Sequence, residues 1–477
     1  MSSASKTFPP VPESLRSKNP LAYLGFYDPG AIIASVTIGS GETVFAARGG
    51  AIFGYALVWC VLLVSALKAV QAYSGMRVIT LTGRHPVQYW ARMRGPKAWF
   101  PFLLGLVALF IMASTFSALP KALATLLVQL AERGSELRGY ATELNGIASA
   151  ILILSAIAAM GSSYRTLELG QTVVILLFLL FIVASFLALR PDLGVLLRSA
   201  LVVSIPDYPV WVREGYPAIV SRAPWVEAMT FIGLIGGNST DYMAYLSFLR
   251  DKEWGLAGRL TESEEGQDFP PPDSPEERAK GRLWLRAPLD MLLSFAIVAL
   301  FSVIFLVLGA SILGPSRLVP NASELLTVQA RFLTDLHPRL APLYVVGIVT
   351  VFLGTIYGFF ELQTRALYEC ARVVAPRWRG VSMSRIRNFV VVYGAGSGLL
   401  LIWTRWDAVA LLTPAVLLSV FASGLWCFAM LWVDRRFLPR SYRMSAPLAF
   451  ALLVAGVVLT AFSIRSVYDF LVGQPSL

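Results

Sequence analysis

Ionisable side chains stand at a few places in stretches that are otherwise apolar. Glu42 closes the glycine-rich "GSGE", Asp28 opens "DPG", Asp241 follows "IGGNST", and Lys68 lies well inside a long apolar run. A charged side chain costs about 3 kcal/mol at the centre of a membrane helix unless it is paired or reaches water. Carboxylates beside helix breakers could bind a cation, and a lysine could neutralise one of them. We therefore ask which elements hold these groups.

The composition is that of a membrane protein. Of the 477 residues, 56% are hydrophobic and only 14% are charged, whereas a soluble domain has roughly 25% charged residues. Apolar runs long enough to cross a bilayer recur along the chain. We expect no removable signal, because the first twenty or so residues are polar. The predicted spans are 24–48, 52–75, 97–119, 143–161, 170–189, 228–249, 288–314, 341–364, 389–404, 407–432 and 445–464.

The basic residues set the expected orientation. Lysine and arginine favour one set of connections between spans by about two to one, which predicts a cytoplasmic N-terminus and a C-terminus on the outer side. This distribution explains the net charge of +11 without nucleic-acid binding. Cys60, Cys370 and Cys427 follow no spacing pattern, so no disulfide framework or metal knuckle is expected.

Two of the predicted spans are interrupted by glycines, the first at 39–42 and the sixth at 235–241. Broken segments at matching places of two five-helix halves are typical of inverted-repeat transporters. The freed backbone groups are tolerated where they line a cavity; the alternative is glycine used only for close helix packing. The predicted units are a cytoplasmic segment 1–22, a first repeat 23–190, an outer loop 191–226 with short helices, a second repeat 227–432 and an extra helix in 433–477.

The connection 251–287 between the sixth and seventh spans is predicted to be a cytoplasmic linker. Its part 261–282, "TESEEGQDFPPPDSPEERAKGR", is acidic, rich in proline and poor in apolar residues. Such a composition favours a mobile segment.

Several stretches resemble the Nramp divalent-metal transporters. "IFGYALVWCVLLVSALKAVQAYSGMRVITLTGRHPVQ" (52–88) is similar to the second helix of that family and the loop behind it. "YRTLELGQ" (164–171) resembles its link between helices four and five, and "FIGLIGGNSTDYMAYLSFL" (231–249) its sixth helix. The resemblance implies an all-α membrane protein of about eleven helices with the LeuT-like fold, which moves a metal ion by alternating access.

The family carries an Asp-Pro-Gly-Asn break in helix one, and "DPG" (28–30) is the obvious match. The spacing to the Gly54-Tyr55 pair that opens helix two, and the spacing forward from Asp28, both place the family's break at Gly39 instead. The resemblance therefore puts the family's metal-binding Asp at Gly39 and its Asn at Glu42. On this alignment Asp28 is not a ligand.

In helix six the resemblance places the family's Met-Pro-His on Thr240, Asp241 and Tyr242, with a backbone carbonyl from Gly237. A hydroxyl thus replaces the thioether that favours transition metals. The predicted metal ligands are all oxygens, which suits Mg²⁺, Ca²⁺ or Mn²⁺. We expect charged ligands from Glu42 and Asp241 and neutral oxygens from Ser40, Gly237 and Thr240, with Gly39 allowing the unwound backbone.

Each charged group also has a simpler interpretation. Glu42 could pair with Lys68, and Asp241 could cap the second half of helix six. Lys68 could extend toward the membrane surface, or it could be a fixed charge that stands in for a coupling ion. Farther along, Glu361 either lines a cavity or pairs with Arg365 one turn later.

The family relays protons through acids in helix three and a histidine in helix six. Here the third span has no acid, and the two histidines, His85 and His337, are expected in loops. We therefore predict transport without proton coupling.

Two alternatives remain open. On the same fold the cargo could be a small zwitterionic or cationic organic solute, with Glu42 or Lys68 as its counter-charge. The chain could also be a membrane sensor or scaffold that transports nothing. No nucleophile–base set or phosphate loop indicates an enzyme, and no cofactor is expected. The expected partners are the lipid bilayer and the transported ion or solute; we expect a monomer.

Overall fold

The computed structural model describes residues 7–17, 19, 22, 41–132, 141–161, 164–259, 271–286, 289–319 and 328–472. Every regular element in these residues is a helix. The first half comprises α1 (Glu13–Arg16), η2 (Gly41–Ala46), α3 (Ala47–Phe53), η3 (Gly54–Leu57), α4 (Val58–Thr82), α5 (Pro86–Trp90), α6 (Trp99–Glu132), α7 (Ala141–Met160) and α8 (Tyr164–Leu189).

Three short helices connect the halves: α9 (Leu193–Leu201), α10 (Val210–Gly215) and α11 (Pro217–Val220). The second half comprises α12 (Pro224–Leu234), α13 (Ser239–Asp251), α14 (Pro275–Trp284), α15 (Leu289–Leu308), η6 (Gly309–Leu313), α17 (Arg331–Thr334), η7 (Pro338–Leu340), α18 (Ala341–Val374), α19 (Met383–Ile402) and α20 (Ala408–Phe437), and α21 (Ala446–Val472) follows it.

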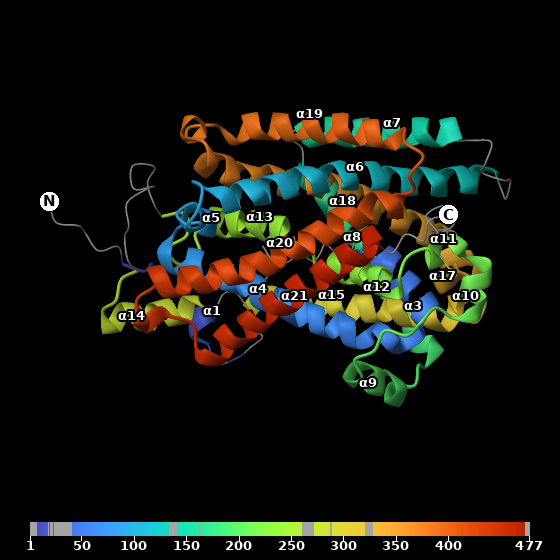
Figure 1. Cartoon of the computed structure of the whole chain (residues 1–477), viewed down its shortest axis with the longest axis horizontal. Coiled ribbons are helices and arrows are strands. Elements are labelled where there is room, and N and C mark those ends of the chain that lie inside the picture. The colour runs from blue at the N-terminus through green and yellow to red at the C-terminus, as the bar shows by residue number, and fades with distance from the viewer. Residues whose placement is uncertain are drawn as a thin grey trace.

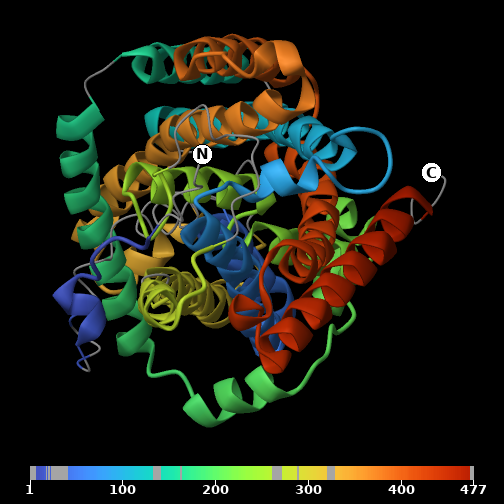
Figure 2. The same ribbon diagram turned by 90° about the vertical axis from the view of Figure 1, so that its left-hand side faces the viewer.

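Most of the long helices run along the longest axis of the molecule (Figure 1), and α8 crosses them (Figure 2). α6, α7, α18 and α19 pack against one another, while α20 packs against α6 and α21. The view turned by 90° shows α7 and α19 as the outermost layer (Figure 2). α4 lies inside the bundle, in contact with α13, α15, α20 and α21. The helices that carry the predicted site are therefore surrounded by others.

The prediction of an all-helical membrane protein is confirmed. Among the described residues, eight helices are long and apolar enough to cross a membrane. A ninth candidate is the pair Leu176–Leu189 and Leu193–Leu201, bent by 106°. All of the predicted spans coincide with helices, although the first is described only from Gly41 onward. The sixth is divided into α12 and α13, as its glycines predict.

Different elements gather at the two ends of the bundle. α1, α5 and α14 lie at one end, and α10, α11 and α17 lie at the other (Figure 1). α21 runs from the first end to the second, so α1 and the end of α21 lie at opposite ends of the bundle (Figure 1). Which end faces the cytoplasm remains a prediction from the basic residues.

The prediction of a mobile linker is wrong for the second half of 261–282, since α14 forms there. Ser274 caps its N-terminus by accepting a hydrogen bond from the Glu277 amide at 3.2 Å. At its other end the Trp284 indole donates to the Pro9 carbonyl at 3.2 Å. Tertiary contacts with the N-terminal segment therefore order a sequence whose composition alone favours disorder. Residues 260–270 lie outside the described part of the chain.

Candidate functional site

The break in helix six is built by two glycines. Residues 235–238 separate α12 from α13, and Gly236 and Gly237 have φ values of +72° and +76°. Side-chain-bearing residues rarely adopt this left-handed region. A Cβ added to Gly236 would lie 2.8 Å from the Phe295 ring. Glycine is therefore required here by both conformation and space, and the turn frees carbonyl groups from the helical hydrogen-bond pattern.

Lys68 fills this break from α4. Its Nζ donates hydrogen bonds to the carbonyls of Gly233 at 2.9 Å, Ile235 at 2.6 Å and Gly237 at 2.7 Å. The residue is only 1% exposed. The interpretation that Lys68 extends toward the membrane surface is wrong, because carbonyl oxygens freed by the break lie within its reach and compensate its charge.

A second side chain satisfies another freed carbonyl. The Tyr242 hydroxyl, from the first turn of α13, donates to the Gly236 carbonyl at 2.7 Å. Backbone groups that leave a helix inside a membrane must find such partners. Side chains of α4 and α13 thus hold the break in one conformation.

Asp241 caps α13. Its Oδ2 accepts hydrogen bonds from the Asn238 amide at 2.9 Å and the Asn238 side-chain nitrogen at 2.8 Å. In return the Asn238 Oδ1 accepts from the Thr240 amide at 2.9 Å, which completes a capping box. The interpretation of Asp241 as a cap is confirmed. Its second oxygen, Oδ1, is buried and has no hydrogen-bond partner among the described residues.

α18 contributes a polar group that sequence reasoning missed. The Gln363 Nε2 donates to the Thr240 Oγ1 at 3.1 Å, and the residue is fully buried. Its Oε1, like the Ser239 Oγ, has no hydrogen-bond partner within the described structure. The only signal in the sequence is a glutamine inside an apolar span. Three buried oxygens without a partner in the described structure are thus found around the first turn of α13. Ser239 and Asp241 belong to that turn, and Gln363 of α18 binds it through Thr240.

Of the predicted ligands, the structure brings together Gly237, Thr240 and Asp241. Gly39 and Ser40, as well as Asp28, lie outside the described residues. Glu42 belongs to η2, but its side chain is not described, so its pairing with Lys68 remains a prediction. η2 packs against α12 and α15. Within the described part of the chain no three His, Cys, Asp or Glu residues form a group that could hold a metal.

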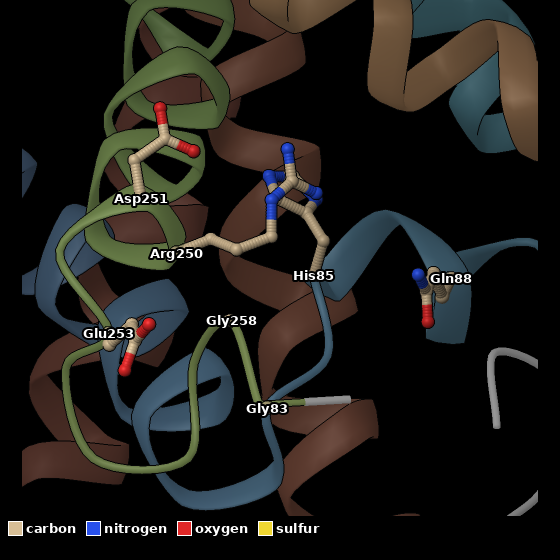
Figure 3. Close-up of a pocket in the computed structure, with 7 residues that line it drawn as sticks. All are labelled: Gly83, His85, Gln88, Arg250, Asp251, Glu253 and Gly258. Carbon is tan, nitrogen blue, oxygen red and sulfur yellow. The ribbon is translucent and has the colours of Figure 1, made fainter. Parts of the chain in front are cut away.

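A separate pocket opens at the far end of α13 (Figure 3). It has a volume of about 300 Å³ and is lined by Gly83, His85, Gln88, Arg250, Asp251, Glu253 and Gly258. Arg250 and Asp251 lie ten residues or more beyond Thr240, or roughly 15 Å along the helix. The pocket therefore does not belong to the break.

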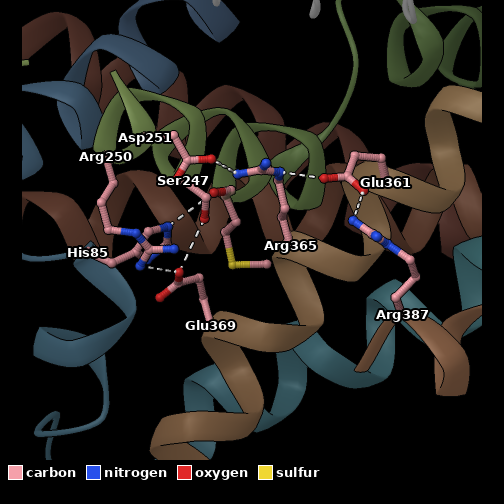
Figure 4. A network of polar contacts seen from close by, with 9 residues as sticks. His85, Ser247, Arg250, Asp251, Glu361, Arg365, Glu369 and Arg387 are labelled. Atoms are coloured by element: carbon pink, nitrogen blue, oxygen red, sulfur yellow. Dashed lines mark hydrogen bonds and ion pairs between the residues drawn. The ribbon is translucent and has the colours of Figure 1, made fainter. Parts of the chain in front are cut away.

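A network of charged side chains surrounds this end of α13 (Figure 4). Arg250 pairs with Glu369 of α18 at 2.6 Å, and Asp251 pairs with Arg365 of α18 at 2.6 Å. Arg365 also binds Glu361 at 2.8 Å, which confirms the pairing of these two residues. The network continues to α19 through an ion pair of 3.0 Å between Glu361 and Arg387.

At the opposite end, a buried ion pair joins α12 to α3. The Arg48 guanidinium of α3 donates to the Glu227 carboxylate in the first turn of α12, and each side chain is 6% exposed. Tyr208 is buried near this pair and stacks on Phe53, the last residue of α3. Sequence reasoning missed both charges, because each lies at the edge of an apolar run where an exposed side chain is ordinary.

Solved structures share this fold. The crystal structure of a manganese transporter from Eremococcus coleocola, in complex with an aromatic bis-isothiourea compound, aligns with 99% of this chain and 92% of that chain, with a TM-score of 0.65 and 12% identity. The crystal structure of MhsT in complex with L-phenylalanine aligns with 92% of this chain and 98% of that chain, with a TM-score of 0.55 and 12% identity. Mhp1, a transporter of the nucleobase-cation-symport-1 family, aligns with 93% of this chain and 93% of that chain, with a TM-score of 0.52 and 15% identity.

The arrangement of helices, with a broken sixth span, is the LeuT-like fold that these solved structures share. The model of the natural resistance-associated macrophage protein-like (Nramp) family matches residues 30–469. The chain therefore belongs to the Nramp family, as the resemblance of its helices two and six implies. No curated protein matches its sequence.

Proposed function

We propose that this protein transports a divalent metal ion across the membrane by alternating access. Family membership supports the class of cargo, and the manganese transporter of Eremococcus coleocola has the same fold. The observation that carries the proposal is the set of buried oxygens on the first turn of α13 and on α18. Asp241 Oδ1 and Gln363 Oε1 are buried without a hydrogen-bond partner among the described residues, and such oxygens are natural ligands for a hard cation.

The proposed ligands come from both breaks. Asp241 and Thr240 supply oxygens from α13, and Gln363 adds one from α18. Glu42 and Ser40 supply oxygens from the first break, where Gly39 permits the unwound backbone. The Gly237 carbonyl, which already accepts one hydrogen bond from Lys68, has a second lone pair.

The charges of the site favour weak, reversible binding. Lys68 offsets one of the two carboxylates, Glu42 and Asp241, so the proposed site carries a net charge of about minus one. A transporter must release its cargo, and a lower charge speeds release. Thr240, which stands where the family has a thioether, favours Mg²⁺, Ca²⁺ or Mn²⁺ over softer ions.

We propose further that transport is not coupled to protons. α6, the third span, contains no acid within Trp99–Gln129, and both histidines lie outside the spans. His85 caps α5 and His337 caps η7. A proton-coupled carrier needs a group in the membrane that titrates near ambient pH. Neither histidine is placed to serve, so the role would fall to Glu42 or Asp241, which we assign to the metal instead.

Metal uptake into proteoliposomes tests the proposal. Asp241→Asn and Glu42→Gln should each weaken metal affinity tenfold or more, about 1.4 kcal/mol. Asparagine at 241 keeps an oxygen for the Asn238 amide, so the cap survives. Asp28→Asn is the matched control and should leave affinity unchanged. Uptake with no internal acidification supports uncoupled transport. A protein that moves no divalent metal, or an effect of Asp28→Asn equal to that of Glu42→Gln, would contradict the proposal.

A small amine or zwitterion is a second candidate cargo. The observation that favours it is the binding of the Lys68 ammonium by the break, which shows that these carbonyls accept an amine. Inhibition of uptake by metals but not by amines would exclude this cargo. No flux of either cargo would favour the third alternative, a sensor or scaffold.

A further inference from the structure

The three carbonyls around Lys68 have the geometry of a cation site. Their oxygens belong to Gly233, Ile235 and Gly237 and lie 2.6–2.9 Å from one nitrogen. Carbonyl oxygens accept and do not donate, so three of them require three N–H donors on that nitrogen. A protonated lysine has three and a neutral amine has two. The group bound in the break is therefore an ammonium ion attached to α4.

The surroundings pack closely around this site, and Lys68 is only 1% exposed. A Cβ added to Gly233 would lie 2.1 Å from the Val416 side chain of α20, and one added to Gly236 would meet Phe295 of α15. A charge in such a place needs compensation. The carbonyl dipoles provide part of it, and the Asp241 carboxylate acts on Lys68 electrostatically.

We propose that the carbonyls of Gly233, Ile235 and Gly237 form a binding site for a small monovalent cation, which the side chain of Lys68 occupies permanently. The lysine takes the place of an ion that would otherwise come from solution. The consequence for transport, which rests on the proposed function, is that the break of helix six keeps its shape without any second cation. Uptake should therefore proceed equally in sodium, potassium and choline salts.

A simpler account is that Lys68 is an ordinary structural lysine bound to whichever carbonyls are near. The two accounts differ in what happens when the side chain is removed. A cation site that has lost its tethered ammonium should accept a free one. The turn that carries the carbonyls is still shaped by the left-handed Gly236 and Gly237, and by the Tyr242 hydroxyl bound to the Gly236 carbonyl. A merely structural contact leaves a defect that no salt repairs.

The test is chemical rescue of full-length Lys68→Ala, purified in detergent without any metal. Thermal unfolding is measured in chloride salts of ammonium, ethylammonium, propylammonium and tetramethylammonium at equal ionic strength. We expect the primary ammonium ions to raise the unfolding temperature of the variant by several degrees, with no such rise in the wild type. Tetramethylammonium has no N–H donor and should have no effect.

Lys121→Ala is the matched control. The Lys121 ammonium also donates to two carbonyls, those of Thr404 at 2.9 Å and Trp406 at 2.7 Å, but the residue is half-buried near the end of the bundle. Water can replace it there, so its removal should create no dependence on ammonium. Lys68→Met is a second control. The methionine side chain fills the space that the lysine side chain occupied, so a free ammonium ion cannot enter, and this variant should be destabilised and not rescued.

If Lys68→Ala is too unstable to purify in ordinary salt, the yield of monodisperse protein prepared in propylammonium, compared with tetramethylammonium, is the readout. A higher yield in propylammonium supports the proposal, and equal yields, including no protein in either salt, overturn it. A variant as stable as the wild type without any amine also overturns it. Because no metal is present in this test, failure of metal transport in the wild type leaves its outcome unaffected.

Discussion

The two halves of the sixth span are anchored in different ways. The anchor of α12 is the Arg48–Glu227 pair, in which each side chain is 6% exposed. Two ion pairs join α13 to α18: Asp251 (49% exposed) with Arg365 (15%), and Arg250 (24%) with Glu369 (2%). Both members of the α12 pair are buried, whereas the α13 pairs each include a partly exposed member and belong to a wider network (Figure 4).

This difference indicates which half can move at low cost. Separating the partners of a buried ion pair leaves a charge without compensation and costs about 3–5 kcal/mol. Exposed pairs exchange their partners for water and contribute about 0–1 kcal/mol each. We infer that α12 and α3 stay together, whereas the Asp251–Arg365 pair at the end of α13 can open at low cost. Under the proposed alternating access, such a difference would let one half of the span move while the other stays fixed.

The largest expected effect comes from splitting the buried pair. Glu227→Gln leaves the Arg48 guanidinium buried beside a neutral amide, and it should lower the free energy of unfolding by about 3–5 kcal/mol. Thermal unfolding in detergent measures this loss. The double variant Arg48→Met with Glu227→Leu removes both charges and fills the space, and it should be near wild-type stability. A single variant as stable as the double variant would show that this anchor is not deep.

Glu369→Gln should have the next largest effect. Glu369 is 2% exposed and binds Arg250 at 2.6 Å and the Ser247 hydroxyl at 3.2 Å, but Arg250 can turn toward water. We expect a loss of about 1.5–3 kcal/mol, which is typical of a hydrogen bond to a charged group. If the two halves are anchored differently, the loss of unfolding free energy in Glu369→Gln must be smaller than that in Glu227→Gln, with both measured in the same detergent.

His85 makes the same end sensitive to pH. Burial lowers the pKa of its ring from the ordinary 6.5, while Glu369 opposes this shift and Arg250 adds to it. The ring also needs a neutral Nδ1, which accepts from the Val87 amide at 3.3 Å, while its Nε2 donates to the Met243 carbonyl at 3.1 Å. The folded state thus prefers the neutral ring.

The sign follows from proton uptake. Because the pKa of His85 is lower in the folded state, the unfolded state takes up its proton first as the pH falls through 6.5. Stability is therefore complete above this pH and decreases below it. We expect the unfolding temperature of the wild type to fall by a few degrees more than that of His85→Asn when the pH is lowered past 6.5. Asparagine can still cap α5, and equal slopes would contradict the prediction.

The sequence predicts these anchors very unevenly. The spans and the break follow from local properties, namely apolar length and the glycines 236 and 237. The partners of Lys68 could not be predicted, because its carbonyls lie more than 160 residues away in the chain and only the packing of α4 against the broken helix brings them together. The order of α14 was missed for the same reason: Trp284 and Glu277 bind the N-terminal segment.

The smallest expected effect is that of Asp251→Asn, which removes the ion pair of 2.6 Å between α13 and Arg365. Asp251 is half-exposed, and Arg365 keeps Glu361 and its position 3.9 Å above the Phe248 ring. The free energy of unfolding should therefore fall by less than about 1 kcal/mol. Glu253→Gln is the control, because Glu253 pairs with Arg259 within a loop, at 3.2 Å and without joining two helices.

Local opening distinguishes these two variants better than global stability does. If the end of α13 is the movable anchor, Asp251→Asn should speed amide hydrogen exchange in its last turn and leave α12 unchanged. Glu253→Gln should alter neither helix, although it removes an ion pair of the same kind. Faster exchange in α12, or a loss of stability as large as that of Glu227→Gln, would mean that the two halves open as one unit and that the difference between their anchors has no mechanical meaning.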